Sequence, residues 1–194
     1  GEEIGMTNPY YDNINLYKDV ESINYYDILK QQGKDEKEII KVLQSKSRDN
    51  SRTPMHWSKC SRAGFTTGTP WLSVSKNYEE INVENSLEDN NSIFYHYQKL
   101  IKLRKEYDIV AYGDFELILE DHKDIFAYIR NHNNEKLLVV NNFYGKETVF
   151  QLPSQFNFDN YKSNILISNY KNSSEDFKKV NLRPYESIVY HLEK

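Results

Sequence analysis

Residues 48–57 hold the side chains of this chain that are best suited to binding a polar ligand. The stretch contains Arg48 and Arg52 together with an aspartate, an asparagine and a tryptophan. Pro54 keeps the preceding residue out of helical geometry, and Asp, Asn and Ser favour turns, so a fixed loop is expected. An arginine presents a planar fork of donors, and Trp57 presents a flat apolar face with one donor. Such a loop suits a site that grips hydroxyl groups, although arginines that only pair with nearby carboxylates would give the same pattern.

Other residue types that carry out catalysis or bind metals occur without the spacing that these functions require. A retaining glycosidase needs two carboxyl groups about 5 Å apart. Glu2 and Glu3 are adjacent on an expected strand end, so they should point to opposite faces and form no such pair. No glycine-rich phosphate loop and no Ser or Cys nucleophile motif is present. With one cysteine and no His-x-x-x-His spacing, we expect no metal and no cofactor; the histidines are His56, His96, His122, His132 and His191.

Composition and charge narrow the class of partners. A chain of 194 residues with 38% hydrophobic residues suits one large or two small domains. The net charge is −4 and no basic tract occurs, so nucleic acid is not an expected partner. No stretch is long enough for a transmembrane helix and no signal peptide opens the chain, so no membrane partner is expected. The single cysteine, Cys60, fits a reducing cytoplasm, which is the predicted location.

Helices are predicted on both sides of the polar loop. Residues 19–32 carry an apolar helical stripe of Ile23, Tyr26, Ile28 and Leu29, which Gly33 should end. A second short helix should follow, because Asp35 and Glu38 resemble a capping box. Irregular chain is then expected to about residue 90, since glycines and a proline interrupt it. Residues 92–106 form the clearest predicted helix, with a common face made of Ile93, Tyr97, Leu100, Ile101 and Arg104.

From about residue 111 the period changes to that of strands. Phe115, Leu117 and Leu119 alternate with polar neighbours, interrupted only by Ile118. Turn signals such as Asn133 with its following asparagine separate further short strands, which is typical of an antiparallel sandwich. The predicted strands cover residues 125–130, 136–140, 148–152, 164–167, 177–181 and 187–192.

Three blocks of sequence resemble the α-amylase superfamily, glycoside hydrolase family 13. They are the Gly-Glu-Glu-Ile-Gly-Met-Thr-Asn run at 1–8, the polar loop at 48–57 and the Ala-Gly-Phe-Thr-Thr-Gly-Thr-Pro-Trp run at 63–71. His56 departs from the family pattern, where Gln is more frequent. The nearest branches are trehalose-6-phosphate hydrolases and oligo-1,6-glucosidases. The resemblance favours the former because of the segments 8–9, 18–22, 165–170 and 183–192.

The resemblance also implies roles. In this family the three catalytic carboxylates precede the 1–8 block, and the third lies in an Asn-His-Asp motif that is not found here. No catalytic residue is therefore expected in this chain. An arginine of the polar loop helps to fix the sugar at the non-reducing end. We favour Arg52 for this role and expect Arg48 to be a scaffold residue that pairs with Asp49 or Asp19.

These inferences combine into one interpretation of the chain. The fold class is α+β: the helical and loop end of a (β/α)8 barrel over 1–110, then an antiparallel β-sandwich over 111–194. The chain should be the C-terminal part of a retaining α-glucosidase acting on a small sugar or sugar phosphate. Alone it should be inactive. A non-catalytic sugar-binding or interaction domain is the alternative of another class. Without the rest of the barrel, the apolar face of the 92–106 helix should pack back on the sandwich, and a second copy should bury the remaining apolar surface in a homodimer.

Overall fold

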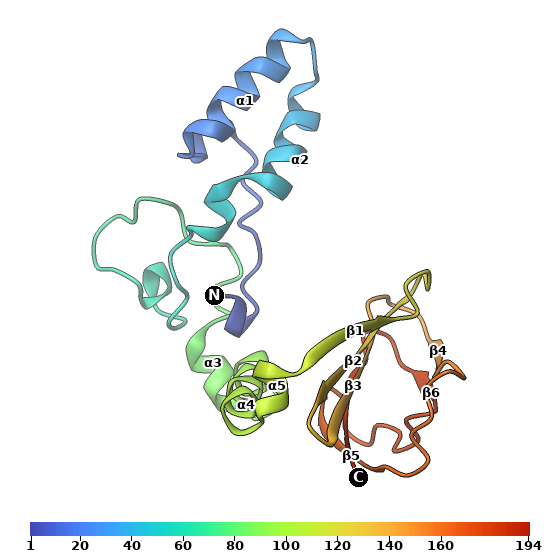
Figure 1. The fold of residues 1–194 in the computed structure, drawn as a ribbon. Coiled ribbons are helices and arrows are strands. Elements are labelled where there is room, and N and C mark those ends of the chain that lie inside the picture. Colours follow the sequence, from blue (N-terminus) through green and yellow to red (C-terminus); the bar gives the residue numbers. More distant parts are fainter. The chain divides into compact units, whose positions relative to one another are not determined.

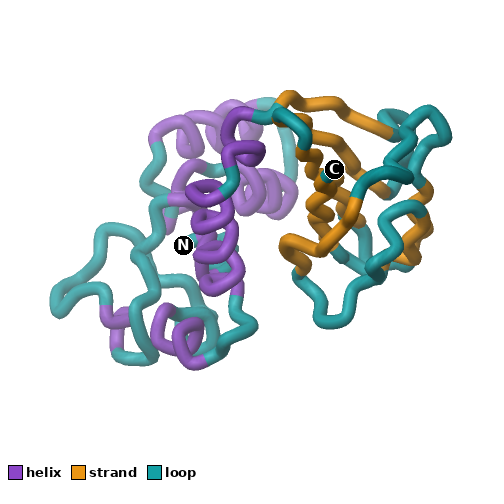
Figure 2. Tube along the Cα trace, turned by 60° about the horizontal axis from the view of Figure 1, so that its bottom comes forward, coloured by secondary structure: helices purple, strands orange, loops and turns teal.

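Helices and loops make up the first half of the chain, and strands make up most of the second (Figure 2). A computed structural model describes every residue from 1 to 194 and divides them into two units, residues 1–98 and 99–194. Each unit contains a buried apolar cluster of its own. The predicted domain boundary near residue 110 stays a prediction.

The first unit is built around a helical hairpin of α1 (Val20–Gln31) and α2 (Glu36–Lys46), seen in Figure 1. Long irregular segments precede and follow the hairpin. They contain α3 (Val83–Glu88), the beginning of α4 (Ile93–Glu106), and short 3-10 helices at Glu2–Ile4, Ile14–Leu16, Arg48–Ser51 and Ser61–Gly64.

Local sequence signals set the ends of the hairpin helices. Asp19 and Asp35 are the N-caps of α1 and α2, and each accepts a hydrogen bond from a backbone N–H of the first turn. Gly33, with φ at 79°, follows α1, and the amide of Lys34 closes a Schellman motif on a carbonyl of the last turn at 3.1 Å. The predicted cap at Asp35 and the stop at Gly33 are confirmed. Glu38 does not return the second bond of a capping box to Asp35.

Fewer residues of α1 are buried than the predicted apolar stripe contains. Tyr26 of α1 packs with apolar residues of α2 and of the adjoining loops. Ile23 and Ile28, predicted to face the core, are 36% and 48% exposed. The reason is that α1 is covered mainly on the side that faces α2, where Ser22 and Tyr26 are its buried residues. The buried apolar cluster consists of Tyr11, Tyr17, Tyr26, Ile39, Ile40, Leu43 and Leu72.

Two predicted irregular or extended segments are helical. The strand end expected at residues 1–6 is wrong, because Glu2–Ile4 form a 3-10 turn closed by Gly5 in the left-handed region at φ 74°. The irregular stretch to residue 90 contains α3, whose N-cap Asn82 accepts a hydrogen bond from the amide of Asn85 at 2.8 Å. An asparagine N-cap is a readable signal, but the helix is too short to show an apolar period.

Helix α4 is confirmed within one residue of its predicted start, but most of its apolar face is exposed. None of its residues is buried. Leu100 and Ile101 belong to the same unit as the sheet and are 41% and 53% exposed, so the predicted packing of this face on the sandwich is wrong for them. The predicted homodimer stays a prediction.

The second unit contains two antiparallel sheets, as predicted (Figure 1). The larger sheet has the strand order β1-β2-β3-β7-β5 and the smaller pairs β4 with β6. All seven predicted strands are present; they are β1 (Asp114–Ile118), β2 (Ile125–His132), β3 (Glu135–Asn142), β4 (Thr148–Gln151), β5 (Lys162–Ser168), β6 (Lys179–Leu182) and β7 (Ser187–Glu193). The β2–β3 hairpin turns at Asn133, whose φ of 52° suits asparagine.

Both faces of the larger sheet carry apolar side chains. Alternate residues of β2, β3 and β7, such as Ile129, Leu138 and Tyr190, belong to the main core together with β4 and β6. The residues between them, such as Leu137 and Val139, pack against the short helix α5 (Asp108–Tyr112) on the other side. Coverage of both faces explains why the middle of β3 is an unbroken buried run.

The phase predicted for β1 is wrong. Ile118, which looked like an interruption, is 4% exposed, whereas Phe115 and Leu117 are 56% and 36% exposed. In the register with β2, Ile118 lies opposite the buried Ala127, and Phe115 and Leu117 lie opposite residues of the other face. Since β1 is an edge strand, its apolar alternation does not reveal which face is covered.

Candidate functional site

The polar loop at residues 48–57, called here the signature loop, begins directly at the end of α2. Its first residues form the 3-10 helix Arg48–Ser51. Ser47 ends α2 and also caps the new helix, because its hydroxyl accepts a hydrogen bond from the amide of Asp49. The loop therefore leaves the hairpin in a defined direction.

Asp49 is the buried anchor of the signature loop. It is fully buried, and its Oδ2 accepts hydrogen bonds from the amides of Lys18 at 2.6 Å and Asp19 at 2.9 Å. These amides lie at the start of α1, thirty or more positions earlier in the chain. A carboxylate bound to two backbone donors is a strong, directional tie. It holds the signature loop against the beginning of α1.

Asp19 extends this anchor. Its Oδ2 accepts from the amide and hydroxyl of Ser22, and its Oδ1 accepts from Nη1 of Arg52 at 3.2 Å. Burial alone would raise the pKa of Asp19, but the bonds from Ser22 and Arg52 hold it below its ordinary value. The hydroxyl oxygens of Ser22 and Ser47 also lie within hydrogen-bond distance of each other, at 2.8 Å. Asp19, Ser22, Ser47, Asp49 and Arg52 thus form one continuous network.

The two arginines differ in their surroundings. Nη1 of Arg52 lies 3.2 Å from Asp19 and 3.9 Å from Oδ1 of Asp49, and the side chain is 41% exposed. Arg48 instead pairs with Glu21 at 2.9 Å and is 64% exposed. The expected pairing of Arg48 with Asp49 or Asp19 is therefore wrong, because those carboxylates hold Arg52. The hydrogen bond and ion pairs of the Arg52 side chain are all made through Nη1, which leaves Nη2 and Nε to donate to a ligand.

A cavity of about 510 Å³ lies between the 1–8 block and the signature loop. Neither Arg48 nor Arg52 lines it. The side-chain Nδ2 groups of Asn8 and Asn50 both donate to the backbone carbonyl of Gln44 near the end of α2, at 2.9 and 3.0 Å, which joins the two walls. The lining residues are Gly1, Glu2, Gly5, Met6, Thr7, Asn8, Asn50, Ser51, Thr53 and Met55. The two blocks singled out in the sequence are thus brought together around one hollow.

Glu2 takes part in a local contact. Its Oε1 accepts a hydrogen bond from the hydroxyl of Tyr97 at 2.6 Å, and this bond raises the pKa of Tyr97. Because residues 2–4 form a 3-10 turn, the strand argument about Glu2 and Glu3 does not apply. Consecutive residues of a 3-10 helix are nevertheless about 120° apart. The two carboxylates therefore do not lie side by side as a catalytic pair.

His56, the position that departs from the family pattern, is fully buried. Its Nδ1 lies 2.8 Å from the carbonyl of Ile81, which requires the proton on Nδ1. The backbone carbonyl of His56 accepts from the amide of Val83 at 2.9 Å. His56 thus ties the end of the signature loop to the start of α3. No group of side chains suited to a metal forms at this loop.

Sequence reasoning missed the tyrosines beneath the loop. The hydroxyl of Tyr17 donates to the carbonyl of Tyr11, and that of Tyr11 donates to the carbonyl of Ser73. Burial, with Asp49 nearby, raises the pKa of Tyr17 to about 12, so it remains a neutral donor. The rings of Tyr11 and Tyr17 pack edge to face, with their centroids 5.4 Å apart. In a chain with sixteen tyrosines, nothing in the sequence marks these two.

Comparison with known families is consistent with this arrangement. Residues 1–113, more than half of the chain, match the family described as the catalytic domain of α-amylase. The chain belongs to the α-amylase family. Residues 125–189 match the family described as the C-terminal domain of the α-amylase SusG. The predicted fold class, a barrel end followed by an antiparallel sandwich, is confirmed.

Individual relatives of the α-amylase family align along the whole chain. A trehalose-6-phosphate hydrolase of Bacillus subtilis (strain 168) is 54% identical over 194 residues, which are 100% of this chain and 34% of that protein. An oligo-1,6-glucosidase of Halalkalibacterium halodurans is 49% identical over 98% of this chain and 34% of its own length. The crystal structure of the trehalose-6-phosphate hydrolase TreA of Bacillus licheniformis is 59% identical with a TM-score of 0.96, and the match covers 100% of this chain and 35% of that one.

This chain spans about a third of the length of these curated relatives. No helix in it combines the length and apolar character needed to cross a membrane.

Proposed function

We propose that this chain forms the C-terminal part of a retaining α-glucosidase that hydrolyses trehalose 6-phosphate to glucose and glucose 6-phosphate. The observation that carries the proposal is the 59% identity, over the whole chain, to the trehalose-6-phosphate hydrolase of B. licheniformis. In this proposal the nucleophile and the acid/base carboxylate belong to the remainder of a longer protein. Residues 1–110 complete its barrel, and residues 111–194 form the sandwich that follows.

The chain's own contribution would be to position the sugar. Arg52 is fixed at Nη1 by Asp19, while its other guanidinium nitrogens are without a partner and the side chain is 41% exposed. A guanidinium anchored on one side has lost part of its freedom before a ligand arrives, so binding a hydroxyl costs less entropy. Such a contact orients the substrate and does not transfer a proton. Arg48, at the surface and paired with Glu21, is the weaker candidate for this role.

The experiment is a comparison of substrates with the full-length protein that contains this chain. We expect kcat/KM for trehalose 6-phosphate to exceed that for isomaltose by at least a hundredfold. Preference for isomaltose would refute the proposal in favour of an oligo-1,6-glucosidase. That second candidate is supported by the 49% identity to the enzyme of H. halodurans. No turnover of either sugar, together with binding of one of them, would favour a non-catalytic sugar-binding protein.

The remaining predictions about the protein follow from this proposal. The 194-residue chain alone should not hydrolyse a nitrophenyl α-glucoside, because catalysis would need carboxylates from the rest of the barrel. A cytoplasmic location and a homodimer stay predictions. Fractionation of cells and light scattering of the purified protein test them.

A further inference from the structure

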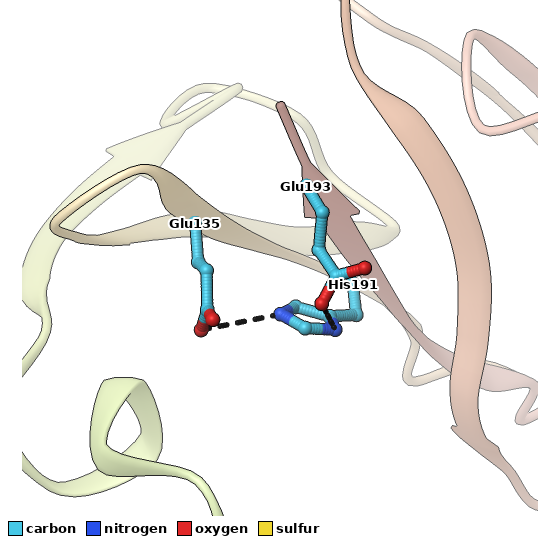
Figure 3. A group of neighbouring side chains, drawn as sticks. All are labelled: Glu135, His191 and Glu193. Atoms are coloured by element: carbon cyan, nitrogen blue, oxygen red, sulfur yellow. Dashed lines mark ion pairs between the residues drawn. The ribbon is translucent and has the colours of Figure 1, made fainter.

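Three side chains that are far apart in the sequence meet on one face of the larger sheet. β3 and β7 are antiparallel neighbours, and Glu135 lies directly opposite Glu193 in their register. His191 is two residues before Glu193, so both side chains point to the same face. Figure 3 shows the two carboxylates on either side of the imidazole ring. We call this group the Glu135–His191–Glu193 cluster.

The imidazole of the cluster is buried, whereas the carboxylates are accessible. His191 is 3% exposed, while the side chains of Glu135 and Glu193 are 43% and 58% exposed. The ring of Tyr107 packs edge-on against the imidazole at 5.4 Å between ring centroids. The imidazole, which lies between two accessible acidic groups, is thus packed against a neighbouring ring.

A nitrogen of this buried ring has no hydrogen bond. Nε2 of His191 is inaccessible to solvent and lacks a partner. The carboxylate oxygen Oε2 of Glu135 lies 3.4 Å from Nε2, and Oε1 of Glu193 lies 3.7 Å from the other ring nitrogen, Nδ1. Buried polar atoms are almost always satisfied in folded proteins, so an unpartnered one calls for an explanation. Here Nε2 faces the carboxylate of Glu135, while Nδ1 of the same ring faces that of Glu193.

We propose that the Glu135–His191–Glu193 cluster binds a divalent cation of the zinc type. One nitrogen of His191 and one oxygen from each glutamate provide the protein ligands, and water completes the coordination. The three ligand atoms lie within 4.8 Å of one another. In a tetrahedral zinc site with bonds of 2.0–2.1 Å, two ligand atoms are separated by about 3.4 Å. In this proposal the exposed glutamate side chains rotate to close the remaining gap.

The ligand types favour zinc-like ions over the abundant hard cations. Imidazole nitrogen suits Zn²⁺, Co²⁺ and Ni²⁺, whereas Ca²⁺ and Mg²⁺ prefer sites made only of oxygen. With a neutral imidazole, the two carboxylates supply a charge of −2, which a divalent cation balances. A cation bound here would link the start of β3 to the end of β7, so binding should also stabilise this edge of the sheet.

The competing arrangement is a protonated imidazole held between the two carboxylates. It would place one carboxylate at each ring nitrogen and needs no metal. The two arrangements respond oppositely to acid. Metal binding requires an imidazole lone pair and ionised carboxylates, so it weakens as the pH falls, whereas an imidazolium pair forms on protonation of the ring.

The test is a titration of the purified protein with Zn²⁺ at pH 7.5 in competition with a chromophoric chelator. We expect one strong site, and at least tenfold weaker binding in Glu135→Gln and in Glu193→Gln. Both substitutions are at accessible side chains and keep the side-chain shape, so folding should be retained and circular dichroism checks this. Glu116→Gln, a change at an exposed glutamate of β1, is the matched control and should leave the affinity within twofold.

A second measurement identifies the ligand atom. Nitrogen NMR of the imidazole rings should show one nitrogen of His191 shifting with Zn²⁺ at one equivalent, with His191→Asn used to assign the signal. Mg²⁺ and Ca²⁺ at the same concentration should leave it unchanged. Absence of a saturable site, or equal Zn²⁺ affinity in both glutamine variants and the parent protein, would overturn the proposal. A His191 signal that responds to acid but not to Zn²⁺ would establish the imidazolium arrangement instead.

Discussion

Glu186, which immediately precedes β7, is a buried charge whose contribution to stability can be calculated. It is 2% exposed. Arg183 donates to Oε2 through Nε at 3.0 Å and to Oε1 through Nη2 at 2.6 Å, and Ser173 donates to Oε1 at 2.6 Å. The backbone amide of Arg183 adds a fourth bond at 2.9 Å. Arg183 also stacks on the ring of Tyr170, 4.1 Å from its centroid.

These contacts determine how stability depends on pH. Burial alone would raise the pKa of Glu186, but the bonds from Arg183 and Ser173 lower it from 4.5 to about 2. A folded-state pKa below the unfolded value adds stability at pH above 4.5, and that stability is lost as the pH falls toward 2. The difference corresponds to about 3 kcal/mol at pH 7 and about 2 kcal/mol at pH 3.5.

We expect Glu186→Gln to lower the free energy of unfolding of the sheet unit by about 3 kcal/mol at pH 7, and by about 2 kcal/mol at pH 3.5. Unfolding in urea is monitored by hydrogen exchange of the β7 amides, which reports on the sheet unit. Tryptophan fluorescence would not report on it, because both tryptophans lie within residues 1–98. Glu116→Gln is the matched control. If the loss in Glu186→Gln were the same at both pH values, or no larger than that of the control, the charge of Glu186 would not stabilise the fold and this reasoning would be refuted.

Three further predictions test the site, its anchor and the register of β1. Arg52→Ala in the full-length protein should lower kcat/KM by roughly ten- to a hundredfold, because a charged hydrogen bond contributes about 1.5–3 kcal/mol. Lys102→Ala, at a 71% exposed side chain, should not change the kinetics, and equal values for the two variants would exclude Arg52 from the site. Asp49→Asn should destabilise the first unit by about 1–3 kcal/mol, since a neutral amide binds the two backbone donors more weakly; thermal unfolding that matches the parent protein would argue against the anchor. Ile118→Ala should cost about 2–5 kcal/mol and Leu117→Ala less than about 1 kcal/mol; the reverse order in chemical unfolding would restore the phase first predicted for β1.

Elements with strong local signals could be predicted from the sequence. The ends of α1 and α2 follow from Asp19, Gly33 and Asp35, whose side-chain or backbone preferences act within a few residues. The strands of the second unit follow from short alternating segments separated by turn residues such as Asn133. In each case the information lies within one element, so no knowledge of the rest of the fold is required.

Errors occurred where burial depends on which neighbours an element meets. Ile28 has the spacing of a core residue but lies on a side of α1 that α2 does not cover. Ile118 appeared to break an alternating pattern, yet it is the covered residue, because the edge strand presents its other face to solvent. Period alone gives two candidate faces for a strand, and tertiary packing selects one of them.

Only part of the site could be predicted from the sequence, and there is a physical reason why the loop was recognised and its anchor was not. The signature loop was recognisable because its unusual residue types are contiguous. Its anchor was not, because the amides that bind Asp49 belong to residues 18 and 19, which the fold brings beneath it. The same limit applies to the Glu135–His191–Glu193 cluster. A search for histidine pairs at helical spacing detects only ligands that lie on one helix. The ligands of this cluster lie on two strands, because antiparallel pairing of β3 with β7 places position 135 beside position 193. A ligand set distributed over two strands leaves no local spacing to detect, so sites of this kind become visible only once strand register is known.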